Sequence, residues 1–333
     1  MSVLAVLTNN DEALRRCLED EVVPRLVGRR ARVTAVSRRP SSASTSYDTE
    51  IVTAELADGG RLDVFLKDFG RIRLPKEAHE HRRERELGVY RDLIGDTDIG
   101  TARYYGSVWD EEEGRHWLLL ELVQGTEVRS LDVEHWITAA GWLGRLQGHF
   151  AGSPAVTDPP AFLQRHDEAF FRAKGESARR SVERLAPALA PRMANVLDGY
   201  EQIVGIMAGQ EPTLVHGAYR PANVLIGRTN GQPRICPTDW ELAAVGSALY
   251  DLAFFCDGFE PPVLDRMWDV YCERLEEAGL QAPDRAELRT VVDCFRVYRV
   301  IAWLAPAVEK RYSAADVERL VARGELLLPL VLG

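Results

Sequence analysis

The spacing of apolar residues changes several times along the chain, and each change predicts a new structural element. In residues 10–27 the apolar residues Leu14, Leu18 and Val22 fall on one face of a helix, and Asn10 and Asp11 are suitable N-caps. Three segments then have strand character: residues 31–36, 51–56 and 61–67. A Ser/Thr-rich turn at residues 40–46 separates the first two, so a three-stranded meander is expected.

The next part of the chain completes a small lobe. Residues 75–93 are charged with helical periodicity, and residues 104–108 and 117–121 return to strand character. Residues 124–130 contain Gly125 and read as a hinge. We therefore expect two domains, an N-lobe at residues 1–123 and a helical C-lobe at residues 124–333.

The second lobe is predicted to be mainly helical. The expected helices are residues 135–150, 161–173, 181–207, 263–278, 285–307 and 314–328. Short apolar stretches between residues 214 and 238 predict a hairpin-like segment inserted among these helices. The fold class expected from this order is α+β, with a small antiparallel-sheet lobe and a larger helical lobe.

Composition narrows the possible functions. The 333 residues carry a formal net charge of −10, which disfavours general nucleic-acid binding and leaves a cationic substrate as one option. The apolar start at residues 1–7 has no basic region and is too short for a signal peptide, and no apolar stretch is long enough to span a bilayer, so a cytoplasmic protein without membrane association is expected. The five cysteines are scattered and predict neither a disulfide framework nor a zinc site.

The strongest chemical signal is the segment T-L-V-H-G-A-Y-R-P-A-N-V-L-I-G at residues 213–227, followed by Asp239 in P-T-D-W-E. It resembles the catalytic loop and metal-binding segment of the aminoglycoside phosphotransferase and choline kinase-like family, which has a protein-kinase-like bilobal fold. In that family the loop reads H-G-D, four residues, then N. His216, Gly217, Asn223 and Asp239 match by position, and G-x-x-x-Y-D-L-A at residues 246–253 is also similar.

The resemblance implies ATP and Mg²⁺ as cofactors, with Asn223 and Asp239 as metal ligands. This fits the preference of Mg²⁺ for oxygen ligands and the dependence of phosphoryl transfer on positioning and charge neutralisation. His216 is expected to hold the loop by hydrogen bonds, and Asp251 to brace it.

The resemblance also assigns nucleotide contacts in the first lobe. Lys67 stands where the family's lysine contacts the α- and β-phosphates, and Glu86 where its ion-pair partner lies, with Glu84 as an alternative partner. The glycine-free loop with Ser44, Thr45 and Ser46 is a candidate for covering the phosphates, or else a simple turn. The remaining two candidates, Glu121 and Val123, would face the adenine from the hinge.

One position departs from the family pattern. Ala218 replaces the loop aspartate that orients or accepts the proton of the acceptor hydroxyl, a contribution typically worth about 10²–10⁴-fold in rate. Three explanations stay open: an enzyme in which another group or the substrate itself handles the proton, a nucleotide-binding pseudokinase, or a deliberate Asp-to-Ala substitution. Arg220, two residues further, is a candidate for stabilising the γ-phosphate or else a solvent-exposed arginine.

We therefore expect a kinase that transfers the γ-phosphate of ATP to a hydroxyl group of a small molecule. The acidic residues Asp257, Glu260, Asp265 and Asp269 are candidates for lining a site for a cationic acceptor. The alternatives are a peptide Ser/Thr kinase of natural-product biosynthesis and a pseudokinase that serves as a binding or regulatory module. The sequence does not indicate an oligomeric state.

Overall fold

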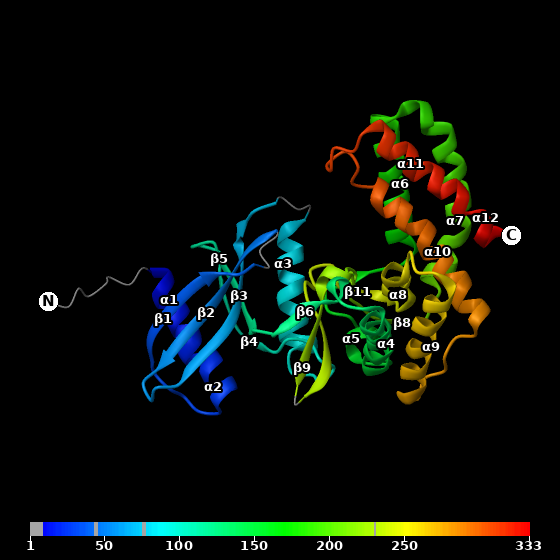
Figure 1. The fold of residues 1–333 in the computed structure, drawn as a ribbon. Helices are drawn as coiled ribbons and strands as arrows, with labels where there is room; N and C mark the ends of the chain where they lie inside the picture. Colours follow the sequence, from blue (N-terminus) through cyan, green and yellow to red (C-terminus); the bar gives the residue numbers. More distant parts are fainter. Residues whose placement is uncertain (1–8, 43–45, 75–77, 230) are drawn as a thin grey trace. The chain divides into compact units, whose positions relative to one another are not determined.

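The computed structural model describes residues 9–42, 46–74, 78–229 and 231–333 (Figure 1). The chain forms two compact units. The first comprises Met1–Thr126 and Leu225–Glu241, and the second Glu127–Val224 and Leu242–Gly333. The first unit thus includes a segment that follows the catalytic loop in the sequence, whereas the sequence analysis placed all residues after 123 in one lobe. The expected domain division stays a prediction.

A five-stranded sheet forms the centre of the first unit, in the order β1-β2-β3-β5-β4. Its strands are β1 (Val33–Pro40), β2 (Tyr47–Leu56), β3 (Arg61–Ile72), β4 (Tyr104–Asp110) and β5 (Arg115–Glu121). All neighbouring strands are antiparallel. The expected meander and the two later strands are confirmed, with each strand extending beyond the segment predicted from its pattern.

The N-terminal helical segment covers one part of this sheet. It consists of α1 (Asn9–Cys17), a π-helical turn η1 (Leu18–Val22) and α2 (Val23–Val27). Leu14, Leu18 and Val22 are fully buried in one hydrophobic cluster with sheet residues such as Val52 and Leu66. The apolar face read from the sequence therefore packs as expected, because burying it removes apolar surface from water.

Two further parts complete the first unit. The charged helix is α3 (His79–Gly88), continued by the π-helical turn η2 (Val89–Ile94). The expected hairpin is present as β9 (Val224–Thr229) and β10 (Gln232–Pro237), which form a three-stranded sheet with β6 (Gly125–Glu127) in the order β10-β9-β6. This hairpin leads directly to Asp239.

The second unit is mainly helical (Figure 1). Its helices are α4 (Val133–Phe150), α5 (Pro154–Thr157), α6 (Glu168–Leu185), α7 (Ala190–Ala208), α8 (Leu249–Cys256), α9 (Pro261–Glu277), α10 (Arg285–Leu304), α11 (Ala314–Leu327) and α12 (Pro329–Leu332), with short 3₁₀ turns η3 (Val128–Ser130), η4 (Pro187–Leu189) and η5 (Pro221–Asn223). A small sheet of β7 (Gln164–Arg165), β11 (Ala244–Ser247) and β8 (Pro212–Val215) has the order β7-β11-β8. The catalytic loop follows β8.

Two expected helices were wrong in their bounds. The helix expected at residues 161–173 begins at Glu168, because Asp167 caps it by accepting a hydrogen bond from the Phe170 N–H. The helix expected at residues 181–207 is divided between α6 and α7, since Pro187 lacks an N–H and cannot continue a helix. The sequence analysis also missed α8. No helix among the described residues combines the length and apolar character needed to cross a membrane.

Candidate active site

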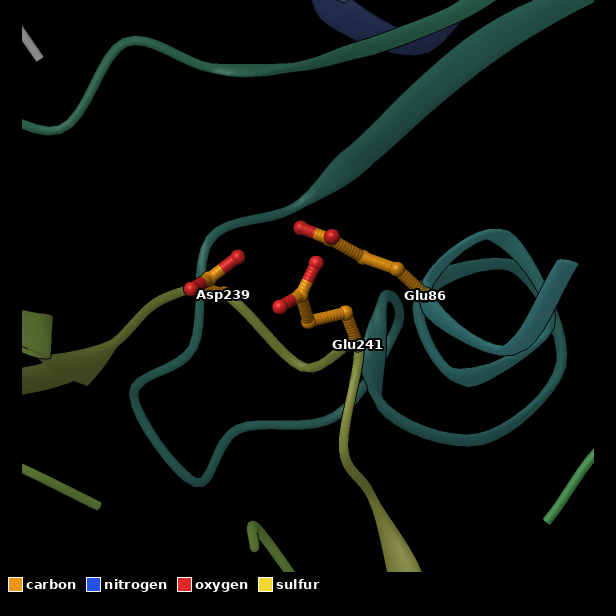
Figure 2. Close-up of side chains that lie close together, drawn as sticks. All are labelled: Glu86, Asp239 and Glu241. Atoms are coloured by element: carbon orange, nitrogen blue, oxygen red, sulfur yellow. The ribbon is translucent and has the colours of Figure 1, made fainter. Parts of the chain in front are cut away.

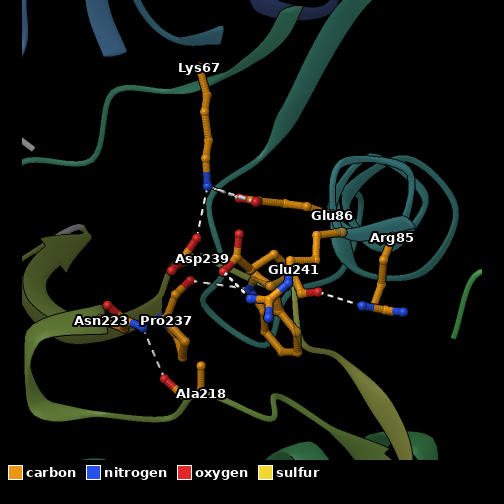
Figure 3. A network of polar contacts seen from close by, with 10 residues as sticks. Lys67, Arg85, Glu86, Ala218, Asn223, Pro237, Asp239 and Glu241 are labelled. Carbon is orange, nitrogen blue, oxygen red and sulfur yellow. Dashed lines mark hydrogen bonds and ion pairs between the residues drawn. The ribbon is translucent and has the colours of Figure 1, made fainter. Parts of the chain in front are cut away.

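Lys67 lies on β3 with its side chain almost fully buried among carboxylates. Its Nζ donates to Glu86 Oε2 at 2.7 Å and Oε1 at 2.9 Å, and to Asp239 Oδ1 at 2.8 Å (Figure 3). The expected pairing of Lys67 with Glu86 is confirmed. The alternative, Glu84, is exposed and lies 3.6 Å from His81. Strand β3, helix α3 and the segment after β10 therefore bring three predicted site residues together within the first unit.

The charges of this cluster depend on one another. Burial alone would lower the pKa of the Lys67 ammonium, but the carboxylates of Asp239, Glu86 and Glu241 raise that pKa above its ordinary value. Burial raises the pKa of Glu86, and the Lys67 ammonium opposes this shift. Lys67 is consequently held as a cation, with all three N–H donors directed to carboxylate oxygens.

Helix α3 also fixes the D-W-E segment at residues 239–241. Arg82 Nη1 lies 3.0 Å from Glu241 Oε1, and Arg85 Nη1 donates to the Glu241 carbonyl at 2.7 Å. Trp240 is fully buried, and its Nε1 donates to the Pro237 carbonyl at 3.4 Å. Asp239 itself has a positive φ of 68°. Arg82 and Arg85 were missed by the sequence analysis, although they stand four residues and one residue, respectively, before Glu86 on the same helix.

Three carboxylates of the first unit are close enough to share a cation. One oxygen each of Glu86, Asp239 and Glu241 lies within 4.8 Å of the others (Figure 2). Hard cations such as Mg²⁺ take carboxylate and amide oxygens, so this donor set fits such an ion. Asp239 was expected as a ligand, whereas Glu241 was noted only as part of the motif and was not assigned to a metal.

The catalytic loop in the second unit is held by buried polar groups. Asp251 on α8 accepts hydrogen bonds from the backbone N–H of His216 at 2.7 Å and of Gly217 at 3.1 Å. His216 is fully buried, and its Nδ1 accepts from the Ala218 N–H at 3.2 Å. The expected bracing by Asp251 and the expected hydrogen bonding by His216 are confirmed. Burial raises the pKa of Asp251 to about 7, against the effect of the backbone donors.

The backbone of this loop needs its glycine. Gly217 has φ +75°, and a Cβ at this position would lie 2.1 Å from the Leu242 carbonyl oxygen. After it, the Ala218 carbonyl accepts from the Arg220 N–H at 2.7 Å and from Asn223 Nδ2 at 3.0 Å. The Asn223 bond uses the amide nitrogen, so the amide oxygen is the atom suited to a cation. Ala218 is buried and adds no polar side-chain group to the loop.

Of the remaining predicted nucleotide-binding residues, the structure describes some and not others. The Glu121 N–H donates to the Arg103 carbonyl at 2.9 Å, while its carboxylate accepts from Arg234, so this residue is already engaged. Val123 follows β5 and makes no hydrogen bond to another described residue, which leaves its backbone groups for a ligand. Ser44 and Thr45 lie outside the described residues. Ser46 accepts a backbone hydrogen bond from Arg73 at 2.9 Å.

Comparison with known sequences places these features in a family. Residues 56–291 match the phosphotransferase enzyme family (APH), which is most of the chain. The chain belongs to this family. The family resemblance found in the catalytic loop is thereby confirmed, and so is the expected class of enzyme, a phosphotransferase. No curated protein matched the sequence.

Solved structures of the same fold cover nearly the whole phosphotransferase chain. A candidate aminoglycoside phosphotransferase of Ralstonia eutropha JMP134 is 16% identical with a TM-score of 0.62, covering 96% of this chain and 97% of that one. Macrolide 2′-phosphotransferase MphH of Brachybacterium faecium is 18% identical with a TM-score of 0.56, covering 92% and 97%. The GDP and kanamycin complex of APH(2″)-IIIa is 14% identical with a TM-score of 0.58, covering 93% and 96%. These likenesses confirm the α+β, kinase-like fold.

Proposed function

We propose that this phosphotransferase binds ATP with Mg²⁺ and transfers the γ-phosphate to a hydroxyl group of a small molecule. The observation that carries the proposal is the cluster of Lys67, Glu86 and Asp239, in which a buried ammonium is held between two carboxylates. A buried charge cluster is costly to maintain, so its retention indicates a ligand that uses it.

Different residues of the site would bind different parts of the nucleotide and the metal ion. Glu86 holds the Lys67 ammonium in place, and Lys67 exchanges its contact with Asp239 for oxygens of the α- and β-phosphates. Asp239 and Asn223 would hold Mg²⁺, with Glu241 as a further carboxylate beside Asp239. When bound, the ion neutralises negative charge on the phosphates. Val123 offers its backbone N–H and carbonyl to the nucleotide base.

The acceptor in the transfer step is an alcohol. The acceptor oxygen forms a bond to the γ-phosphorus, the bond from that phosphorus to the β-phosphate oxygen breaks, and ADP leaves. The hydroxyl proton passes to solvent or to a phosphate oxygen, because Ala218 has no group that accepts it. The loss of general-base assistance predicts slow turnover, since positioning and charge neutralisation supply the rest of the catalysis. Arg220 remains a candidate for contacting the γ-phosphate.

Calorimetry of ATP binding with and without Mg²⁺ tests the nucleotide site. We expect Mg²⁺-dependent binding that Asp239→Ala and Asn223→Ala each weaken at least tenfold, because each removes an oxygen ligand. Asn195→Ala, an exposed change on α7, is the matched control and should bind as the parent does. Absence of ATP binding in the unchanged protein would refute the proposal.

The structure also gives a reason to test a pseudokinase, because the buried Ala218 side chain cannot take the aspartate's role. Comparing the parent with Ala218→Asp, with purified protein, ATP and a panel of hydroxyl acceptors, separates the two functions. An enzyme should gain turnover of roughly 10²-fold or more from the added carboxylate. A binding module should stay at the background rate of ATP hydrolysis in both forms while still binding ATP.

A further inference from the structure

A buried carboxylate in the second unit forms ion pairs with three arginines. Asp257, just after α8, lies 2.8 Å from Arg299 and 3.3 Å from Arg296 on α10, and 3.0 Å from Arg323 on α11. Its side chain is only 8% exposed. Asp257 was expected to line a site for a cationic acceptor, and this stays a prediction, although its charge is already paired with arginines. The Asp269 carboxylate is likewise paired, with Arg285.

Positive charge exceeds negative charge around Asp257. Arg296 also pairs with Asp293 at 2.9 Å, and Arg220 lies close enough for its charge to act on Arg299. The three guanidinium groups of Arg296, Arg299 and Arg323 therefore meet the two carboxylates of Asp257 and Asp293, which leaves one positive charge in excess, and the charge of Arg220 adds to it. Burial lowers the pKa of Arg299, Asp257 opposes this shift, and the charges of the neighbouring arginines lower that pKa further.

Aromatic rings hold the arginines in fixed positions. The Arg299 guanidinium lies 4.6 Å from the centre of the Trp303 ring and 5.4 Å from that of Phe254, and Arg323 lies 6.0 Å from Trp303. Both rings are half-buried and so keep part of their surface exposed. A stacked, planar guanidinium loses little entropy on binding and suits the two oxygens of a carboxylate or phosphate.

The arginine cluster is also connected with the catalytic loop. Arg220 belongs to this loop, two residues after Ala218, and its backbone N–H donates to the Ala218 carbonyl. Its side chain is exposed and makes no hydrogen bond or ion pair with another described residue. An anion held by Arg220, Arg299 and Arg323 would consequently lie beside the loop that serves the acceptor hydroxyl.

We propose that Arg220, Arg299 and Arg323 bind an anionic group, a carboxylate or a phosphate, of the acceptor, and that Trp303 and Phe254 contact its apolar part. This inference rests on the proposed function, because it names the acceptor of the same site: a hydroxylated organic anion. The proposal predicts that a polycation such as kanamycin is not the acceptor. If the arginines only brace α8 against α10 and α11, they have no preference for anions among small molecules.

The test measures binding without nucleotide, by calorimetry, for four related probes. These are 3-(4-hydroxyphenyl)propanoate, its neutral primary amide, 4-hydroxyphenethylamine, and the phosphate monoester of 2-(4-hydroxyphenyl)ethanol. We expect at least one of the two anions to bind ten or more times more tightly than the amide and the amine, and the anion that binds better identifies the group. Equal binding of all four, tighter binding of the amine, or no detectable binding of either anion would overturn the proposal.

Substitutions locate the binding. Arg323→Gln and Arg220→Gln should each weaken anion binding about tenfold and leave the amide unchanged, as expected for loss of a charge-assisted hydrogen bond. Arg319→Gln, an exposed arginine on α11 whose partner is Asp316, is the matched control and should have no effect. Should Arg323→Gln unfold, Arg220→Gln, which breaks no ion pair among the described residues, keeps the test valid. Anion binding that neither substitution weakens would contradict the assigned site.

The two proposals can fail separately. Anion binding is measured without nucleotide, whereas the proposed function is tested by ATP and Mg²⁺ binding. If the protein binds ATP but shows no preference for the anions, the proposed phosphotransferase site is supported and the proposed anionic acceptor is refuted. Binding of the anions without ATP binding would show an anion site in a protein that is not a kinase.

Discussion

At the scale of single residues, the catalytic loop depends on a buried carboxylate that receives backbone donors. Asp251 accepts from His216 and Gly217, and these bonds favour its ionised form, but burial raises its pKa from 3.8 to about 7. The folded protein therefore binds a proton here more tightly than the unfolded chain does. This contribution to stability is complete below the ordinary pKa and is lost as the pH rises through about 7.

Replacing this carboxyl group should remove that pH dependence. Asp251→Asn is expected to be less stable than the parent, because its amide nitrogen would face backbone donors. The difference in the free energy of unfolding between the parent and the variant should be largest near pH 4. It should shrink by up to about 4 kcal/mol towards pH 8, because only the parent has a carboxyl group here whose protonation stabilises the fold. Urea unfolding across this range measures it, with the exposed Asp198→Asn as control. A constant difference across the range would contradict the assigned pKa.

At the scale of elements, α4 and α9 pack unusually closely through glycines of α4. A Cβ on Gly144 would lie 2.5 Å from the Tyr271 carbonyl oxygen and 2.9 Å from Arg274 Cβ, and one on Gly148 would lie 2.4 Å from Ala278 Cβ. These neighbours are backbone or Cβ atoms, which cannot turn away as the end of a long side chain can. The two helices must therefore separate before any larger residue fits here.

Two alanine substitutions should consequently have opposite effects. Gly144→Ala is expected to destabilise the protein by about 1–3 kcal/mol through overpacking. Gly205→Ala on α7 should stabilise it by up to about 1 kcal/mol, because its Cβ would meet only Glu168 Oε1 at 3.9 Å and alanine favours a helix more than glycine does. Thermal and urea unfolding of both variants would check the signs. Equal effects would show that helix propensity, not packing, governs both sites.

The same scale shows what the sequence could and could not predict. Strands and amphipathic helices followed from apolar spacing, because burial of one face is a local property of the pattern. The division between α6 and α7 was missed because helical periodicity continues across Pro187 even though the backbone cannot. Helix α8 was missed because most of its residues are buried on all sides, which removes the periodicity.

The candidate site shows a similar limit. Lys67, Glu86 and Asp239 could be found because their order and spacing resemble those of the phosphotransferase family. Arg82 and Arg85 could not, since a charged helix offers several arginines and only the fold selects those that reach Glu241. The pairing of Asp257 with arginines of α10 and α11 likewise depends on contacts between residues far apart in the sequence, so the sequence could not show that this carboxylate is already paired.

At the scale of the whole molecule, neither compact unit is one continuous segment. The hairpin of β9 and β10 belongs to the first unit, and Arg234 on β10 helps to attach it there, donating to the carbonyls of Gly100 and Thr101 and to the carboxylate of Glu121. Asp239, which follows this hairpin, is thereby kept beside Lys67. The first unit would be incomplete without a segment that the chain forms only after the catalytic loop.

The cysteines can report this organisation. All five are free thiols, and burial raises the pKa of each. Because Cys272 is half-buried and the other four are buried, only Cys272 should react readily with N-ethylmaleimide in the native protein. In rising urea, Cys17 and Cys236 should become reactive at the same concentration, although one lies on α1 and the other on β10, because both are protected by the first unit. Mass spectrometry of the labelled peptides distinguishes the sites. If Cys236 instead became reactive together with Cys256 of the second unit while Cys17 stayed protected, the hairpin would unfold with the helical unit, and the cluster of Lys67 and Asp239 would be lost before the central sheet.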